Sequence, residues 1–295
     1  MPSPFLFSSR RRFVGGSLAA AVAGLHALAA AAPPTRRMPV LFVGHGSPMN
    51  AITDNGFARF LTQWGRNLPA PSAILVVSAH WQTQGETLVG AQARPATIHD
   101  FGGFPRELQE MQYPAPGAPE LARLAARLVR QGQGIATQDW GLDHGTWTVL
   151  HRLYPKADVP VFQVSIDYTR GAAFHHAAGR ELAALRDSGV LIIGSGNVVH
   201  NLGATLRGAP DSMAASAPWA AQFDAAVGRA LAGRDDRALM RYEQLPGAAM
   251  AVATPDHYFP LMYALGAAGQ AEEVRTLYTG FQSGTLSMRC LQAGA

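Results

Sequence analysis

The sequence contains almost no cysteine. Cys290 is the only one in 295 residues, so no disulfide can form within one chain and a zinc site built from cysteines is excluded. The ten histidines are therefore the main candidates for binding a transition metal. Charged residues make up only 15% of the chain and apolar residues 48%, which permits a large core and argues against disorder.

The excess of positive charge is small once the N-terminus is set aside. Lys and Arg number 24 against 20 Asp and Glu, but three of the arginines, Arg10 to Arg12, lie in a leader without acidic residues. The rest of the chain then has 21 basic residues against the same 20 acidic ones, with no basic stripe. Nucleic acid is therefore not an expected partner. Nucleotide binding has no support either, because the sequence has no P-loop and no GxGxxG motif.

Residues 1–32 are predicted to be a signal peptide. Residues 9–14 read SRRRFV, which resembles the twin-arginine consensus of proteins exported after folding, and an apolar segment follows at 15–32. This segment is rich in Ala and Gly and contains His26, so it is weakly hydrophobic for a permanent span of about 20 residues. Cleavage at its end, after export by the twin-arginine machinery, would place the mature chain in the periplasm. An uncleaved membrane anchor is the alternative.

Four apolar runs rich in Val, Ile and Leu are expected to be strands buried on both faces of a mostly parallel sheet. They cover residues 39–44, 73–79, 159–166 and 189–195. Amphipathic helical patterns alternate with them at residues 56–68, 119–132 and 174–189. This alternation predicts an α/β fold, with a single domain over residues 38–295 and helices flanking a central sheet. A late hairpin, formed by residues 274–280 and 284–290, is expected at the sheet edge.

Histidines follow three of the expected strands. His45 comes directly after the first strand, His80 directly after the second, and His200 within a turn of the fourth. The C-terminal ends of parallel strands form the edge at which open α/β sheets bind ligands. Two further histidines, His144 and His257, lie in turns that lead into helical patterns. Small neighbouring residues would let a ligand approach these rings closely.

These five histidines predict a metal site at the C-terminal edge of the sheet. Converging neutral imidazoles without thiolates suit iron, zinc or copper, and a catalytic site leaves one coordination position open. We expect His200 to be a ligand or a general base, and His144 either to support the metal ligands from behind or to contact the substrate. Asp256, next to His257 in the chain, is the alternative third ligand. The expected ligands are His45, His80 and His257.

Other candidate residues are not expected to be catalytic. Ser195 has Ile193 and Asn197 where a nucleophile elbow needs glycines, so a serine hydrolase is excluded. His99, in the run TIHDFGGFP, is the one remaining histidine close to a glycine-rich turn. The others are expected at the surface or on helix faces: His151, His175 and His176.

Six separated segments carry a resemblance to a known family. In chain order they read GHGSPMN, SAHWQT, HDFGGFPRELQEMQYPAPG, DWGLDHGTWTVL, GSGNVVHNL and TPDHYFPLMYALG. They resemble the class III extradiol ring-cleavage dioxygenases, in the subgroup similar to DOPA 4,5-dioxygenase. The resemblance extends from about residue 38 to the C-terminus, and its motifs stand in the family's order.

The resemblance implies a mononuclear non-haem Fe(II) centre, with Zn(II) in some relatives. It implies cleavage of a catechol such as DOPA, caffeate or protocatechuate by O₂, beside the two hydroxyls, to a ring-opened semialdehyde. It further implies that His200 is a general base or fourth ligand and that His144 contacts the substrate or the dioxygen. The implied ligands are His45, His80 and His257, whereas many extradiol enzymes use two histidines and a carboxylate.

The sequence leaves two alternative functions and one structural alternative open. A zinc-dependent hydrolase could use the same histidines to activate water, without O₂. A periplasmic metal-binding protein without activity is a further alternative. Residues 101–104 are expected either to cover the aromatic ring of the substrate or simply to pack in the core.

Overall fold

The computed structural model describes residues 37–208 and 215–294, so the expected signal peptide, residues 1–32, lies outside the described part. From Arg37 onward the chain clusters into one compact unit. Within the described ranges, no helix has the length and apolar character needed to cross a membrane.

An eight-stranded sheet has the strand order β4-β3-β5-β2-β6-β1-β10-β7. Its four central strands are parallel and almost fully buried. They are β5 (Val161–Asp167), β2 (Ala73–Thr83), β6 (Val190–Gly196) and β1 (Val40–Gly44). They coincide with the four apolar runs, because a strand that helices cover on both faces needs apolar side chains throughout. The predicted mostly parallel sheet is confirmed.

Shorter strands extend the sheet on both sides. Beyond β5 lie β3 (Leu88–Gly90) and β4 (Ile135–Thr137), and beyond β1 lie β10 (Cys290–Ala293) and β7 (Val274–Tyr278). β10 pairs antiparallel with both β1 and β7, so the C-terminal segment does form an antiparallel edge.

The second arm of the expected hairpin begins later than predicted. Cys290, at the end of the expected segment 284–290, pairs with β7 as the first residue of β10, whereas the short strand β9 (Leu286–Ser287) pairs with β8 (Phe281–Gln282). The reason is a competing set of contacts, since the Ser287 backbone donates to the Val199 carbonyl at 3.0 Å and its hydroxyl to Asp224 at 2.6 Å. This segment therefore packs beside the loop that follows β6.

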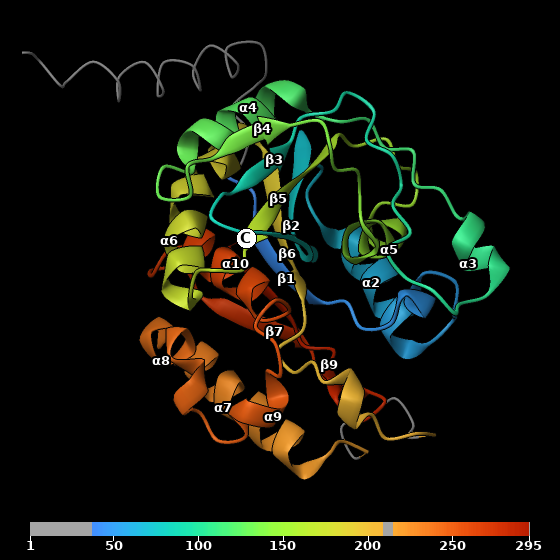
Figure 1. Cartoon of the computed structure of the whole chain (residues 1–295), viewed down its shortest axis with the longest axis vertical. Coiled ribbons are helices and arrows are strands. Elements are labelled where there is room, and N and C mark those ends of the chain that lie inside the picture. The colour runs from blue at the N-terminus through green and yellow to red at the C-terminus, as the bar shows by residue number, and fades with distance from the viewer. Residues whose placement is uncertain (1–36, 209–214, 295) are drawn as a thin grey trace, which may run out of the picture. The chain divides into compact units, whose positions relative to one another are not determined.

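Helices cover both faces of the sheet (Figure 1). On one face lie α2 (Gly56–Asn67) and α5 (His144–Leu153), and on the other α6 (Ala172–Leu182) and α10 (Phe259–Ala268). The 3₁₀ helix η2 (Ala183–Ser188) continues α6, so the helical pattern at 174–189 is divided in two. The remaining helices are α3 (Arg106–Glu110), α4 (Pro119–Leu128), α7 (Pro218–Ala232), α8 (Asp236–Met240) and α9 (Ala248–Ala251), with short 3₁₀ turns η1 (Pro48–Ala51), η3 (Leu202–Ala204) and η4 (Tyr242–Gln244).

Two glycines let α6 and α10 approach closely. A Cβ on Gly179 would collide with the backbone of Tyr263, and a Cβ on Gly266 would collide with the backbone of His176. All ten residues of α10 are buried, which places this helix inside the domain and fixes the turn that precedes it.

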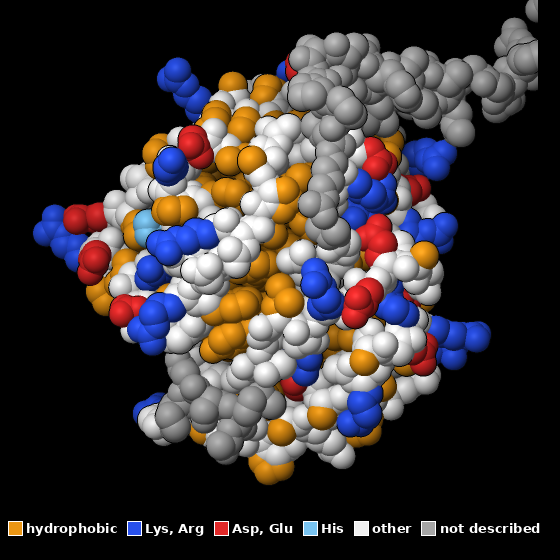
Figure 2. Space-filling model, turned by 180° about the vertical axis from the view of Figure 1, so that it is seen from behind, with side chains coloured by type: hydrophobic (Ala, Val, Ile, Leu, Met, Phe, Trp, Pro, Cys, Tyr) orange, Lys and Arg blue, Asp and Glu red, His pale blue; other side chains and the backbone are white. Residues whose placement is uncertain are grey.

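Charged side chains are interspersed on the face shown in Figure 2. Lys and Arg lie among Asp and Glu there, and they form no continuous basic stripe. This distribution agrees with the small net charge of the chain without its leader, and gives no support for a nucleic-acid surface on that face.

His175 and His176 lie on a buried face of α6 and not at the surface. The His175 ring stacks on Phe259 with centroids 4.1 Å apart. His176 Nε2 lies 3.0 Å from the Asp236 carboxylate at the start of α8, which also accepts a hydrogen bond from Gln270 at 2.6 Å. This contact ties α8 to α6.

Asp236→Asn is expected to lower the free energy of unfolding at pH 7 by about 1–3 kcal/mol, because buried donors lose a charged acceptor. Burial raises the pKa of Asp236, but the hydrogen bonds and charges of His176 and Arg234 outweigh it and lower the pKa. The carboxylate thus stabilises the fold fully above its ordinary pKa of 3.8 and loses this effect as the pH falls through the lower folded value. Urea unfolding should show the difference between variant and wild type shrinking below about pH 4. A difference that stays constant down to pH 2 would contradict this account.

Candidate metal centre

Three of the predicted site histidines lie at the C-terminal ends of central strands. His45 follows β1, and its backbone N–H donates to the Gly196 carbonyl at the end of β6 at 3.0 Å. His80 lies near the end of β2, where the pairing with β5 shifts register. His200 follows β6 after a short turn and forms backbone bridges to Val252 and Leu286.

The other two site histidines precede helices. His144 is the first residue of α5, which Asp143 caps by accepting from the Thr146 N–H at 3.1 Å. His257 lies in the turn before α10, which begins at Phe259. The His257 carbonyl accepts from Asn197 N–H at 2.9 Å, which fixes the turn against the end of β6.

His45, His80 and His257 converge. One nitrogen from each lies within 4.8 Å of the other two. The Nε2 atoms of His45 and His80 are 3.3 Å apart. The ring centroid of His257 lies 5.3 Å from the ring centroid of His45 and 5.1 Å from that of His80. Two nitrogens that share one metal at about 2.1 Å each are roughly 3.0–3.4 Å apart at angles between octahedral and tetrahedral. The distance between His45 Nε2 and His80 Nε2 therefore fits two nitrogens that bind the same ion.

The opposite ring nitrogen of each of these histidines has a partner. His45 Nδ1 lies 3.0 Å from Ser195 Oγ, and His80 Nδ1 lies 3.3 Å from an Asp100 carboxylate oxygen. His257 Nδ1 bonds to the Asp256 carboxylate. Metal-binding histidines characteristically engage their second nitrogen in this way, which fixes the tautomer and the ring orientation.

His257 Nε2 is buried and has no hydrogen-bond partner among the described residues. An orphaned buried nitrogen is costly unless a ligand satisfies it. Together with the paired Nδ1 atoms, this orphan shows that the residues fit a metal bound through three Nε2 atoms. The same geometry favours His257 over Asp256 as the third ligand, because the Asp256 carboxylate is already used to orient the ring.

His200 lies beside this trio. Its ring is parallel to that of His257, with centroids 3.4 Å apart and an interplanar angle of 4°. Nitrogens of His200 and His257 and an Asp256 oxygen also lie within 4.8 Å of one another. The position is compatible with both predicted roles, a fourth ligand or a base next to the metal.

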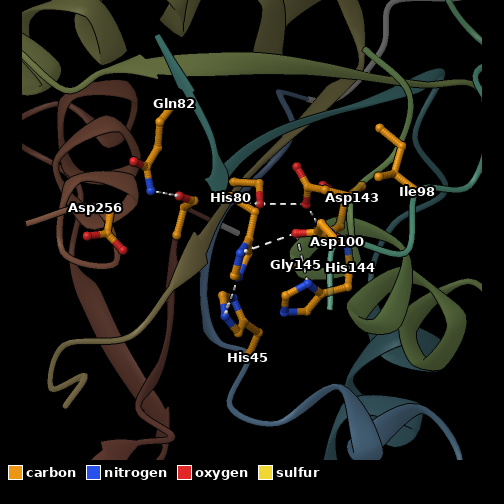
Figure 3. A network of polar contacts seen from close by, with 12 residues as sticks. His45, His80, Gln82, Ile98, Asp100, Asp143, His144, Gly145 and Asp256 are labelled. Carbon is orange, nitrogen blue, oxygen red and sulfur yellow. Dashed lines mark hydrogen bonds and ion pairs between the residues drawn. The ribbon is translucent and has the colours of Figure 1, made fainter. Parts of the chain in front are cut away.

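His144 lies on the other side of His80, with ring centroids 3.8 Å apart. Its Nδ1 lies 3.0 Å from Asp100 Oδ2, and its backbone N–H donates to Asp100 Oδ1 at 2.9 Å. Asp100 therefore contacts both His80 and His144, as Figure 3 shows. His99 points away, with Nε2 2.9 Å from the Met111 carbonyl.

Three orienting residues were missed from the sequence: Asp100, Ser195 and Asp143. Asp143 accepts from Ser78 Oγ at 2.7 Å and from Gln163 Nε2 at 2.6 Å, and it thereby anchors the start of α5 behind the histidines. Figure 3 shows Asp143 beside the cluster. The only signal for Asp100 was its position in a glycine-rich run next to a histidine, whereas nothing local distinguishes the others.

Phe101 packs against the cluster, with its ring 5.3 Å from that of His144 in an edge-on arrangement. Phe104 packs on Phe101 with centroids 5.2 Å apart, and both rings contact the hydrophobic core. Gly103 has a positive φ of 77°, which glycine adopts without strain. The two partly buried rings thus pack against the core, while Gly102 and Gly103 are exposed, and Phe101 lies beside His144.

Burial sets the protonation of the cluster. Burial, and then the neighbouring histidines, lower the pKa of His45 and of His80 well below the usual value. Burial followed by His257 lowers the pKa of His200 to about 3. Burial alone would raise the pKa of Asp256, but its hydrogen bond to His257 lowers it to about 2. Neutral imidazoles beside ionised carboxylates are the states that bind a metal cation.

Comparison with known proteins assigns the family. Residues 39–287 match the family described as the catalytic LigB subunit of aromatic ring-opening dioxygenase. The chain is 46% identical over 262 residues to the 4,5-DOPA dioxygenase extradiol of Escherichia coli K12, and the alignment covers 88% of this chain and 95% of that protein. It is 39% identical over 253 residues to the enzyme of the same name from Beta vulgaris, and that alignment covers 83% of this chain and 92% of the Beta vulgaris protein.

A solved structure agrees. The crystal structure of an uncharacterized Escherichia coli K12 protein superposes with a TM-score of 0.75 at 40% identity, covering 88% of this chain and 100% of that one. The chain therefore belongs to the LigB family, and it is a metal-binding extradiol ring-cleavage dioxygenase similar to those named for DOPA. The predicted enzyme class is confirmed, and the hydrolase and the metal carrier without activity are not favoured.

Proposed function

We propose that this chain uses one Fe(II), held by His45, His80 and His257, to open the ring of a DOPA-like catechol with O₂. The observation that carries the proposal is the arrangement of the three rings. Each Nδ1 is engaged by Ser195, Asp100 or Asp256, and the Nε2 atoms are left toward a common point. Zn(II) fits the same nitrogens, but it is not redox-active. The substrate class follows from the names of the relatives.

Bound Fe(II) would supply open positions for both catechol oxygens and for O₂, and would stabilise the catecholate anion. The protein has two further imidazoles beside these positions. His200, stacked on His257, is placed to take the second catechol proton. His144 Nδ1 lies 3.0 Å from Asp100 Oδ2, and its Nε2 is left to hold a hydrogen bond to substrate or dioxygen. Phe101, against His144, supplies an apolar wall for an aromatic ring.

The test is oxygen consumption by the mature chain, purified without air and loaded with Fe(II). It would be mixed with air-saturated DOPA, caffeate, protocatechuate or catechol, beside a zinc-loaded control. The proposal predicts one O₂ consumed per yellow semialdehyde formed with iron, and none with zinc. The fastest catechol would define the substrate class. Absence of uptake with every catechol, in a protein that holds Fe(II) stoichiometrically, would contradict the proposal.

We also propose that residues 1–32 direct twin-arginine export to the periplasm. Because His sites bind zinc and copper more tightly than Fe(II), folding and metal loading before export would protect the site from the wrong ion. Replacing Arg11 and Arg12 with lysine should leave the precursor in the cytoplasm, as cell fractionation and immunoblotting would show. Unchanged periplasmic accumulation would contradict the twin-arginine route.

A further inference from the structure

The Asp100 carboxylate contacts two imidazoles with the same oxygen. Its Oδ2 lies 3.3 Å from His80 Nδ1 and 3.0 Å from His144 Nδ1, while Oδ1 accepts from the His144 backbone N–H at 2.9 Å. The Asp100 side chain is only 18% exposed. Both contacts are visible in Figure 3. A proposed metal ligand and a proposed substrate contact therefore share one acceptor.

An ionised carboxylate can only accept hydrogen bonds. A ring that turns its Nδ1–H toward this carboxylate has its Nε2 free as an acceptor. For His80 this is the nitrogen 3.3 Å from His45 Nε2. Asp100 thus favours the tautomer that a metal requires on His80, and its hydrogen bond from the His144 backbone N–H holds the start of α5 beside that ring.

Asp100 also belongs to the loop at residues 99–104. On one side of it, His99 is held by the Met111 carbonyl at 2.9 Å. On the other side, Phe101 packs on the His144 ring, and Phe104 packs on Phe101. The position of the aromatic wall therefore depends on where the Asp100 carboxylate is held.

We propose that Asp100 is a positioning residue that couples metal binding at His80 to the placement of His144 and the loop at 99–104. The inference rests on the proposed metal centre. A cation on Nε2 makes the Nδ1–H of the same ring a stronger donor, so metal binding strengthens the contact to Asp100. By thermodynamic reciprocity, the carboxylate strengthens metal binding by the same factor. Metal loading thereby orders the substrate wall before the catechol arrives.

The experiment uses Zn(II), which is redox-inert, on the mature chain and on Asp100→Asn. The Asn side chain keeps the shape, but its NH₂ group must face either the His144 backbone N–H or both Nδ1 atoms. Competition with a chromophoric chelator should show Zn(II) affinity reduced by about 10–100-fold. Asp54→Asn, at an exposed aspartate paired with Arg59, is the matched control and should bind as wild type does.

Hydrogen exchange supplies a readout that a merely structural role would not move. In the wild type, Zn(II) should slow amide exchange across residues 99–104, and in Asp100→Asn this metal-dependent protection should be lost. Asp100→Glu, which retains a carboxylate, should recover part of both effects. The coupling would be overturned if Asp100→Asn bound Zn(II) as tightly as the wild type. It would also be overturned if Zn(II) left the amide exchange rate of residues 99–104 unchanged in the wild type. A wild type that binds no metal would instead overturn the metal centre on which the coupling rests.

Discussion

Replacing His257 with glutamine is expected to abolish stoichiometric metal binding and to reduce ring opening by at least about 10³-fold. His257 offers a buried Nε2 without a partner, and its ring is held by Asp256. Since substitution of residues that merely orient a ligand costs about 10–100-fold in metal affinity or activity, loss of the ligand itself should cost more. A glutamine in this turn would leave His45 and His80 as a pair, which is too few ligands to hold the ion in place.

The measurement is metal content after gel filtration, together with the rate of O₂ consumption. His151→Gln is the matched control, because it makes the same substitution on α5 outside the histidine cluster. The control should keep full metal content and activity. Full occupancy in His257→Gln would show that another residue, with Asp256 the first candidate, is the third ligand.

Replacing His200 with glutamine is expected to preserve metal binding and to slow turnover by about 10²–10⁴-fold, the usual contribution of a general base. The His200 ring lies flat on that of His257, with centroids 3.4 Å apart. A residue in that position can act on a bound catechol without holding the ion. Its loss should therefore lower kcat without changing metal content.

The alternative role of His200, a fourth ligand, predicts a different pattern. Metal affinity would then fall together with the rate, and added Fe(II) would restore part of the activity. Chelator competition and steady-state kinetics on the same preparation separate the two outcomes. Reduced affinity with unchanged kcat at saturating Fe(II) would contradict a role in proton transfer.

The fold was predictable where burial on both faces requires a continuous run of apolar residues. The central strands read as unbroken apolar runs because helices cover both of their faces, and four such runs placed β1, β2, β5 and β6 correctly. The short outer strands β3 and β4 carry no such pattern. β9 was misassigned because, besides its pairing with the adjacent β8, contacts with distant segments hold it in place, such as that between Ser287 and Val199.

The five histidines were predictable for a similar reason. The ends of apolar runs mark His45 and His80, with glycines on both sides of His45, and the sheet geometry brings the two together. Their orienting partners were not predictable. Asp100 reaches His80 only because the loop at 99–104 folds back across the end of β2, and no local pattern encodes that closure. Ser195 looked like a failed nucleophile and instead holds His45.

The most direct test of the account is to locate the metal. Crystals of the mature chain grown without air in the presence of Fe(II) would be measured at the iron absorption edge. The account predicts one anomalous peak, about 2.0–2.2 Å from the Nε2 atoms of His45, His80 and His257. A peak bound by the Asp256 carboxylate, a peak between Asp100 and His144, or no peak in this cluster would contradict it.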